Sequence, residues 1–350
     1  MDKQILFFIA LLITLSIFGW TTKRIVSYFK LTKPFRVGDW GKRFKLMMEV
    51  AIGQTKIFRF PFVGFLHALV FWGFLVILIG SIEMVIDGLF GTDRSLSFLG
   101  FVYDIITASG DVFALIIAIA ILVFLFRRIF MHVKRFSGVE MEHKSHYDAN
   151  IALTIILLLM LSLLGMNTYY LALHTGHTVG FFPVSQFLSQ YIEGGSNISF
   201  WHEFYWWAHI LLIFLFANIL PYSKHFHVFM SVPNVFLSRL EPLGYLYNMP
   251  EITKEVKLMM DPNAVFAEPA EGEEEVARFG IKDVEDITWK NYLDSLTCTE
   301  CGRCTSVCPA KITGKLLSPR KIIMNVRARM KEKGPGLVKE GKTFDDQKAL

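Results

Sequence analysis

Long apolar runs separated by polar segments occupy the first two thirds of the chain. A membrane-spanning helix needs roughly 20 predominantly apolar residues, and five stretches come close to or reach that length. The pattern therefore predicts five transmembrane helices, followed by a soluble region that starts at about Ser223. The predicted spans cover residues 5–20, 60–86, 112–126, 151–173 and 204–221, and mixed residues extend the third span in both directions.

The composition agrees with a membrane protein. Hydrophobic residues make up 53% of the 350 residues and charged residues 19%, with a mean hydropathy of +0.42. Average globular domains have about 45–50% apolar and about 25% charged residues. The four cysteines all lie between Cys298 and Cys308, which excludes a disulfide-stapled secreted domain. The net charge of +5 is modest, and no nucleic-acid partner is predicted.

The basic residues predict the orientation of the chain. Lys and Arg number ten, one, five and none in the four successive segments between the predicted spans. Cytoplasmic loops carry the excess of these residues, so the first and third segments are expected inside. The N-terminus is then outside, and the region after the fifth span is cytoplasmic. The basic loops are expected to contact anionic lipid.

The cysteines of the soluble region form one motif. Cys298, Cys301, Cys304 and Cys308, followed by Pro309, have the spacing C-x2-C-x2-C-x3-C-P. This is the spacing of bacterial-type [4Fe–4S] ferredoxin segments. Zinc is the alternative, but zinc sites usually use paired C-x2-C knuckles, and a disulfide does not suit a reducing cytoplasm. The motif predicts a [4Fe–4S] cluster, with the four cysteines as metal ligands.

The role of the fourth cysteine stays open, because in two-cluster ferredoxins it binds the other cluster. Cys308 either completes a single cluster or serves a second one, although no second cysteine run is present. Residues 345–350 show no structural stop, so we expect the chain to continue beyond residue 350. Residues 262–275 are acidic and predict a solvated linker.

One more helix is predicted after the cysteine run. Ser318 is a suitable N-cap with Pro319 at the first helical position, and Gly334 and Pro335 are expected to end the helix. Its apolar residues recur at helical spacing, and the face they form is expected to cover the cluster. This face consists of Ile322, Ile323, Val326 and Met330.

Four histidines, His67, His209, His225 and His227, lie within or at the ends of the apolar stretches. Ionisable groups are costly there and suggest function. On a straight helix, His209 and His227, 18 residues apart, would share one face about 27 Å apart, and His225 would point roughly opposite. His67 and His227 both lie near the cytoplasmic side and predict axial ligands of a b-type haem. The alternative is interfacial histidines bonded to backbone or lipid.

The outer ends of the spans hold two weaker candidates. A second haem at His209 needs a partner, but span two has Ile77 at that level, which leaves His174 or His177. Glu83 and Asp87 are four residues apart on one helical face and are candidates for relaying quinone protons. The alternative for this pair is two hydrated carboxylates at the membrane interface.

The fifth span resembles a known family. His209 is followed by LPYSKHFH at 220–227 and SVP at 231–233. This is similar to the last membrane helix of the respiratory nitrate reductase gamma subunit family, five-span dihaem cytochromes b, and the resemblance extends roughly over residues 1–240. The family pattern has two histidines on the second span, where this chain has His67 alone.

Together with the cysteine run, the chain resembles membrane-bound iron–sulfur oxidoreductases of the heterodisulfide-reductase type, especially the bacterial group that includes electron-transfer-flavoprotein:quinone oxidoreductases. The resemblance implies electron transfer in a bacterial inner membrane, through haem b and the [4Fe–4S] cluster, between a quinone pool and a cytoplasmic redox partner. That partner would be a flavoprotein or a Cys-rich iron–sulfur subunit. Members usually carry a second ferredoxin run and often a Cys-rich catalytic domain, so we expect an oxidoreductase subunit rather than a complete enzyme.

The predicted fold class is thus an all-α membrane protein. A five-helix transmembrane bundle, residues 1–240, precedes an acidic cytoplasmic linker, 241–290, and a small α-helical ferredoxin-like domain, 291–350, which is expected to be incomplete at its C-terminus. The alternative function is a haem-free membrane anchor whose ferredoxin-like domain docks a soluble oxidoreductase. A transporter would give no reason for the cysteine run, and inverted repeats are not evident.

Overall fold

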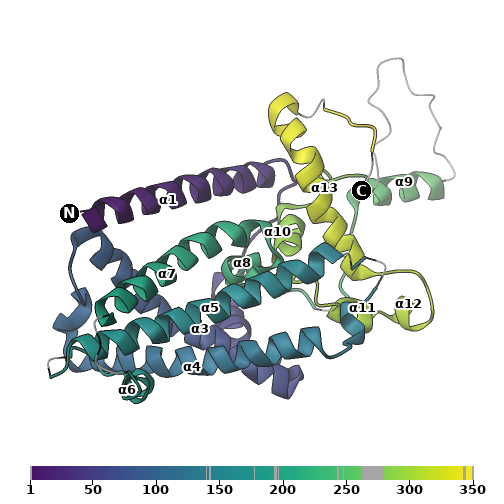
Figure 1. The fold of residues 1–350 in the computed structure, drawn as a ribbon. Helices are drawn as coiled ribbons and strands as arrows, with labels where there is room; N and C mark the ends of the chain where they lie inside the picture. The colour runs from purple at the N-terminus through teal and green to yellow at the C-terminus, as the bar shows by residue number, and fades with distance from the viewer. Residues whose placement is uncertain are drawn as a thin grey trace.

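The computed structural model of the chain is almost entirely helical (Figure 1). It describes residues 2–138, 140–141, 143–176, 178–192, 195, 197–242, 244–246, 248–261, 280–341 and 344–348. Among these residues there is no β-strand, and a single isolated bridge pairs Lys33 with Thr288. The predicted all-α class is confirmed for the described part of the chain.

Five helices are long and apolar enough to cross a membrane. Each overlaps one predicted span, so the prediction of five apolar helices is confirmed. Large apolar side chains on their outer faces, such as Leu6, Phe62 and Ile119, are more than half exposed, which suits helices that meet lipid. The five are α1 (Asp2–Phe29), α3 (Pro61–Phe90), α4 (Phe101–Ile129), α5 (His143–Leu173) and α7 (Ile198–Ile219).

The helices extend beyond the apolar runs that predicted them. The largest difference is in α4, which begins at Phe101 rather than near residue 112. Asp111 interrupts the apolar pattern there, but its buried carboxylate accepts the N–H groups of Val184 and Ser185 at 2.8 and 2.9 Å. It thereby caps the short helix α6 (Pro183–Ser189), and a satisfied carboxylate of this kind can be buried.

The bundle is built around α5, which packs against α4 on one side and α7 on the other (Figure 1). Gly165 allows α7 to approach, since a Cβ there would lie 2.8 Å from the ring of Tyr205. Phe7 of α1 is fully buried against Trp206 and Phe214 of α7. The core between α4 and α5 contains Ala114, Ile117, Ile121, Ile155, Leu159 and Leu164.

The two ends of the bundle differ. The segments 30–60 and 130–142 and the chain after residue 220 meet at one end, which we call the basic end because it holds the Lys-rich and Arg-rich segments. The N-terminus and α6 lie at the other, the distal end (Figure 1). Short elements in the connections are α2 (Trp40–Met47), a π-helical turn (Met48–Ile52) and 3₁₀ turns at Ile57–Arg59, Ser95–Leu99 and Lys134–Phe136.

The chain does not continue as one straight helix from α7 to His227. Pro221 has no N–H to donate to a helical ladder, and α8 (His227–Phe236) begins only at His227. The predicted straight-helix alignment of His209 with His227 was therefore wrong. Two 3₁₀ turns intervene, Leu220–Tyr222 and Lys224–Phe226.

The C-terminal region forms a second helical unit at the basic end (Figure 1). Its core packs α10 and α13 against the end of α1, and it includes Val284 and Ile287. The unit therefore extends back into the range predicted as a linker, whose acidic segment 262–275 lies outside the described residues. The helices after α8 are α9 (Pro250–Met260), α10 (Trp289–Thr297), α11 (Arg303–Ser306), α12 (Pro309–Ile312) and α13 (Pro319–Glu340).

Helix α13 begins where the sequence predicted but ends later. The Ser318 hydroxyl caps it by accepting the Lys321 N–H. The predicted end at Gly334 and Pro335 was wrong, because the helix runs on to Glu340. Gly334 serves packing instead, since a Cβ there would lie 2.9 Å from the ring of Tyr28.

The prediction that the apolar face of α13 covers the cluster was also wrong. Val326 and Met330 are buried in the core that α13 shares with α1 and α10, whereas Ile322 is half exposed. Polar side chains of α13, rather than these apolar ones, contact the cysteine loop.

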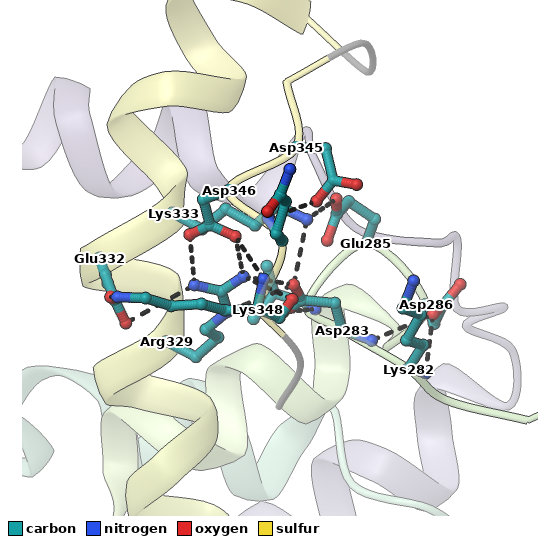
Figure 2. A network of polar contacts seen from close by, with 12 residues as sticks. Lys282, Asp283, Glu285, Asp286, Arg329, Glu332, Lys333, Asp345, Asp346 and Lys348 are labelled. Atoms are coloured by element: carbon teal, nitrogen blue, oxygen red, sulfur yellow. Dashed lines mark hydrogen bonds and ion pairs between the residues drawn. The ribbon is translucent and has the colours of Figure 1, made fainter.

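A buried ionic network holds the C-terminal unit together (Figure 2). Asp283 accepts hydrogen bonds from Arg329 at 2.6 Å and from Lys333 at 3.0 Å. Arg329 also pairs with Asp346 at 2.6 Å, and Lys333 with Glu285 at 2.6 Å. Burial raises the pKa of Asp283, but the two cations outweigh it and hold the pKa below its usual value.

Candidate functional site

The four cysteines lie between the end of α10 and the start of α12, with Cys304 in the one-turn helix α11; we call this segment the cysteine loop. A capping box between Thr288 and Asn291 starts α10, which delivers the chain to Cys298. Gly302 turns the loop with a φ of +71°, and a Cβ there would lie 2.7 Å from the Arg135 carbonyl oxygen. The free thiols of this loop are Cys298, Cys301 and Cys308, all partly buried, and Cys304, which is exposed.

The donor set of this loop fits an iron–sulfur cluster. Thiolates are the ligands such clusters use, and no disulfide consumes them. In the described part of the chain, no three His, Cys, Asp or Glu side chains converge as for a single metal ion, whereas a cluster spreads its thiolates over several irons. Burial raises the pKa of the Cys298 thiol, and nearby cations compensate the charge of a thiolate.

Arginines surround the loop and fix its backbone. Arg327 donates to the Cys298 carbonyl at 3.1 Å, and the buried Arg320 donates to the carbonyls of Arg135 and Glu300 at 2.7 and 3.4 Å. Arg320 is itself paired with Glu140 at 2.7 Å. This arrangement places positive charge beside thiolates that would otherwise repel one another.

Glu300, between the first two cysteines, joins the loop to the bundle. Its buried carboxylate pairs with Lys224 at 3.2 Å and with Arg327, and it accepts the Ser145 hydroxyl hydrogen bond. Burial raises the pKa of Glu300, but these partners outweigh it and hold the pKa below its usual value. Glu300 adopts a left-handed backbone with φ +58°, a strained conformation that persists only where surroundings impose it.

His67 and His227 face each other at the basic end. Their ring centroids are 6.4 Å apart, with 30° between the planes, and two metal–nitrogen bonds of about 2 Å each fit within this separation. The Nδ1 of His227 lies 3.2 Å from the Lys224 carbonyl oxygen, a contact that fixes the tautomer in metal-ligating histidines. The Nδ1 of His67 is buried and has no hydrogen-bond partner among the described residues.

These features fit a ligated histidine pair. A buried ring nitrogen without a partner is costly, and a ligand between the rings would account for two partly buried histidines at the end of an apolar bundle. Burial lowers the pKa of His227, which keeps the ring neutral as a metal ligand must be. The structure thus brings His67 and His227 together, and the ring of a third predicted histidine, His225, also lies close to that of His227.

The cysteine loop lies next to this histidine pair. The guanidinium of Arg303, between two of the cysteines, is 5.5 Å from the ring of Phe60, the N-cap residue of α3. The guanidinium of Arg135 lies 4.8 Å from the same ring. His67 is seven residues after Phe60, two turns along α3, so the loop and the pair share the basic end.

His225 and His209 lie differently from the prediction. The ring of His225 is 5.9 Å from that of His227 rather than opposite it, because the chain is not a straight helix there. Burial and the neighbouring His227 lower the pKa of His225 to about 3. The Nδ1 of the buried His209 lies 3.0 Å from both the Leu159 carbonyl oxygen and the Ser162 hydroxyl. Among the described residues, no second histidine ring lies opposite His209 at the centroid distance of about 6 Å seen for the other histidine pairs.

Two histidines were considered as partners of His209. His174 places its Nδ1 3.0 Å from the Tyr170 carbonyl, within its own helix end, and His177 lies outside the described residues. One membrane histidine was missed by the sequence reasoning, His202, which lies two turns before His209 on α7. That spacing was the available signal.

A cavity of about 310 Å³ opens at the distal end between α3, α4, α5 and α7, and both His202 and His209 line it. Glu83, also in the lining, is 4% exposed and accepts hydrogen bonds from the Leu96 N–H at 2.9 Å and the Tyr103 hydroxyl at 3.1 Å. The cavity is therefore enclosed by apolar helices but presents several polar groups, the usual character of a small-molecule site.

The other carboxylate of the predicted relay, Asp87, has a structural task. It accepts hydrogen bonds from the Thr92 hydroxyl at 2.7 Å and from the backbone N–H groups of Arg94 and Ser95 at 3.0 and 3.1 Å. It thereby shapes the turn after α3. Arg94, which lines the cavity, is stacked 4.3 Å from the ring of Tyr170.

Several residues of the basic end could not be found from the sequence. Glu300, Lys224, Arg320 and Ser145 come from four distant segments, and each is an ordinary polar residue in its local pattern. Only the position of Glu300 inside the cysteine run gave any signal.

Comparison with known proteins supports the cysteine motif first. Residues 289–310 match the family described as "4Fe-4S binding domain". The chain is 30% identical over 338 residues to a probable iron-sulfur-binding oxidoreductase, FadF, of Bacillus subtilis (strain 168), covering 95% of this chain and 43% of that protein. The homologues of this chain are thus iron–sulfur-binding oxidoreductases.

Two further relatives are informative. The chain is 27% identical over 304 residues to EtfAB:quinone oxidoreductase of Syntrophomonas wolfei subsp. wolfei, covering 82% of this chain and 38% of that protein. A probable membrane-anchored ferredoxin of Chromohalobacter salexigens is 38% identical over 50 residues, 14% of this chain and 8% of that protein. The chain spans less than half the length of the relatives it matches. No solved structure matches it.

These relatives and the five apolar helices point to a membrane protein with an electron-transfer role and a 4Fe–4S-binding segment. The match covers the bundle as well as the cysteine loop, so the association of the two parts is shared with longer iron–sulfur oxidoreductases.

Proposed function

We propose that the chain passes electrons between a membrane quinone pool and a cytoplasmic redox partner. A haem b held by His67 and His227 and a [4Fe–4S] cluster held by Cys298, Cys301, Cys304 and Cys308 would supply the one-electron chemistry. The observation that carries the proposal is the facing pair His67 and His227, 6.4 Å apart, with a buried, unpartnered Nδ1 on His67. The pair lies beside the cysteine loop at the basic end.

The orientation follows from the charge of that end. The basic segments would remain in the cytoplasm, in a bacterial inner membrane, with the N-terminus outside. The cysteine loop then faces a cytoplasmic redox partner, a flavoprotein or a Cys-rich iron–sulfur subunit. The chain acts in this proposal as an oxidoreductase subunit, with its bundle at residues 1–240 and its cluster-binding unit in the C-terminal region.

The cavity at the distal end is the best place for the quinone headgroup. Its volume of about 310 Å³ suits part of a small aromatic ligand, and Glu83, Arg94 and His209 supply polar groups in its lining. Oxidation of a quinol releases two electrons and two protons, and the buried Glu83 carboxylate is the group placed to accept a proton. One of the relatives bears the name of a quinone oxidoreductase.

A single haem is the proposed content, because His67 and His227 form a pair and His209 does not. The test is a reduced-minus-oxidised visible spectrum of the purified membrane protein, with counts of haem, iron and acid-labile sulfide. One b-type haem and one cluster per chain are expected. Iron and sulfide without any haem band would overturn the haem assignment.

The second candidate is a haem-free membrane anchor that docks a soluble oxidoreductase through its ferredoxin-like unit. The match to a probable membrane-anchored ferredoxin favours it, although that match covers 50 residues only. It gives no reason for the buried, unpartnered Nδ1 of His67. Quinol-driven reduction of the cluster in proteoliposomes separates the two candidates, because an anchor would not react with quinol.

A further inference from the structure

We propose that Glu300 is a positioning residue that docks the cysteine loop onto the segment carrying His227, with Lys224 as its partner. The inference rests on the proposed function, since it concerns how the residues that would hold the two redox groups are fixed relative to each other. It assigns to Glu300 and Lys224 a role that is separate from ligation.

The carboxylate of Glu300 is the point at which the two parts meet. It lies between Cys298 and Cys301 in the chain and is only 7% exposed. One oxygen pairs with Arg327 of α13, while the other accepts from Lys224 at 3.2 Å and from Ser145 at the start of α5. Both oxygens are therefore occupied, one by the C-terminal unit and one by the bundle.

Lys224 continues the connection to the histidine pair. Its Nζ reaches Glu300, its backbone N–H donates to Asp148 at 3.1 Å, and its carbonyl oxygen lies 3.2 Å from the Nδ1 of His227. The same residue thus binds the cysteine loop with its side chain and orients His227 with its backbone. Contacts of this second kind set the ring orientation and basicity of metal-ligating histidines.

The arrangement is tightly determined. Lys224 is 7% exposed, like Glu300, and removal of one member of a buried pair leaves the other charge uncompensated. The left-handed backbone of Glu300, at φ +58°, is disfavoured for a residue with a side chain, so the contacts of the carboxylate must hold it. The Asp283 network of Figure 2 is similarly buried but bonds to none of the cysteines or membrane histidines in the contacts described, and it provides the contrast.

The test compares Glu300→Gln and Lys224→Met with a matched control, Glu332→Gln, which removes the same charge from a half-exposed carboxylate on α13 that pairs with Lys348 and, at 3.6 Å, with Arg329. Each purified full-length protein is analysed for iron, sulfide and haem, and for the rate at which the haem is reduced once the cluster has been reduced photochemically. We expect unchanged cofactor content in all variants. Haem reduction should slow by about tenfold or more in Glu300→Gln and in Lys224→Met, the scale on which small misplacements of reacting groups act, and stay unchanged in the control.

The midpoint potential of the cluster separates positioning from charge alone. Glu300→Gln removes a negative charge near the cluster and should raise the potential, whereas Lys224→Met removes a positive charge and should lower it. If the two variants shift the potential in opposite directions but both slow the transfer, positioning is supported. Opposite changes in rate, or wild-type rates in both variants, would overturn it.

Two outcomes need a second measurement. If Glu300→Gln fails to assemble the cluster, Lys224→Met decides, because Lys224 is 76 residues away from the loop position it contacts. If the unaltered protein contains no haem, the proposed function fails, and amide hydrogen exchange of residues 298–305 tests the docking by itself. Faster exchange in both variants but not in Glu332→Gln supports the inference, and equal exchange in all three rejects it.

Discussion

The two ends of the helix bundle treat buried histidines in opposite ways. At the basic end, the rings of His67 and His227 face each other, and His67 keeps an unpartnered nitrogen. At the distal end, His209 gives its Nδ1 to a carbonyl and a hydroxyl of α5 and borders a cavity. His209 is buried, whereas His67 and His227 are partly buried, so burial alone does not identify a metal ligand.

The two ends differ in what faces each histidine ring. A ligated histidine needs a facing ligand and a fixed tautomer, and only the basic end combines a facing ring with the Lys224 carbonyl contact. The distal end offers polar groups around a space instead. We therefore expect a haem at one end and a diffusible ligand at the other.

The strongest way to break this comparison is to remove one ring of the pair. If the pair holds a haem as proposed, replacement of His67 or His227 by Ala should abolish the b-type haem absorbance, because each change removes one of the two proposed ligands. The reduced-minus-oxidised spectrum measures this, with His174→Ala as the control that should retain the band. A full haem spectrum in both variants would contradict the assignment.

The stability of the basic end depends on its second ionic network. Asp283→Asn removes the negative partner of two buried cations, Arg329 and Lys333, and should cost about 3–5 kcal/mol in the free energy of unfolding of the C-terminal unit. Denaturant titration followed by amide exchange would measure the loss. Glu332→Gln, at a carboxylate that is half exposed and pairs with Lys348 and, at 3.6 Å, with Arg329, should change the stability far less.

The same network predicts a dependence on pH. The pKa of Asp283 is held below its usual value of 3.8, so its contribution to stability is fully present above that value and is lost as the pH falls through the lower folded pKa. The C-terminal unit of the unaltered protein should lose stability below about pH 4 more steeply than that of Asp283→Asn. Parallel acid titrations of the two proteins would reveal the difference, and identical curves would exclude this role.

The distal end is tested with its buried carboxylate. Glu83→Gln keeps the shape of the cavity lining but cannot accept a proton, and quinol oxidation should fall by about a hundredfold, the lower range for loss of a general base. The haem and iron content should not change. Asp104→Asn, on α4 but outside the cavity lining, is the control, and normal turnover in Glu83→Gln would remove this carboxylate from the proposed reaction.

The smallest effect sharpens the comparison most directly. His209→Gln keeps a hydrogen-bonding group beside Leu159 and Ser162 and should leave the haem band and the haem-to-protein ratio unchanged. Loss of half of the haem would show that His209 is a ligand after all, and that the two ends are more alike than their contacts indicate.

Much of the fold could be predicted because lipid-facing helices carry a strong one-dimensional signal. Five apolar stretches predicted five helices, but most of these helices extend into polar residues beyond the apolar runs. The reason is visible at Asp111, where a charged residue interrupts the pattern and is nevertheless buried, because it caps α6 from another part of the chain. Such partners are distant in sequence and leave no local trace.

The site could be predicted in part for the same reason. The cysteine spacing is local, and residues 289–310 match a 4Fe–4S family; the proximity of His67 to His227 followed from loop charges and span order. The angular argument failed at residues 220–226, where two 3₁₀ turns replace the helix. Glu300 and Lys224 could not be found, because a buried ion pair between segments depends on tertiary packing that neither segment encodes alone.

The contacts of the C-terminal unit also bear on how the protein is made. Residues after 280 are synthesised after all five long helices, yet they bond to three earlier segments. Lys33 lies between α1 and α3, Glu140 between α4 and α5, and Lys224 after α7. Because chains fold progressively from the N-terminus during synthesis, the cysteine loop can close only when these three segments have arrived on one side of the membrane. A chain with one helix inserted the wrong way round would leave the C-terminal unit without some of these partners, so we expect this unit to fold only after correct insertion.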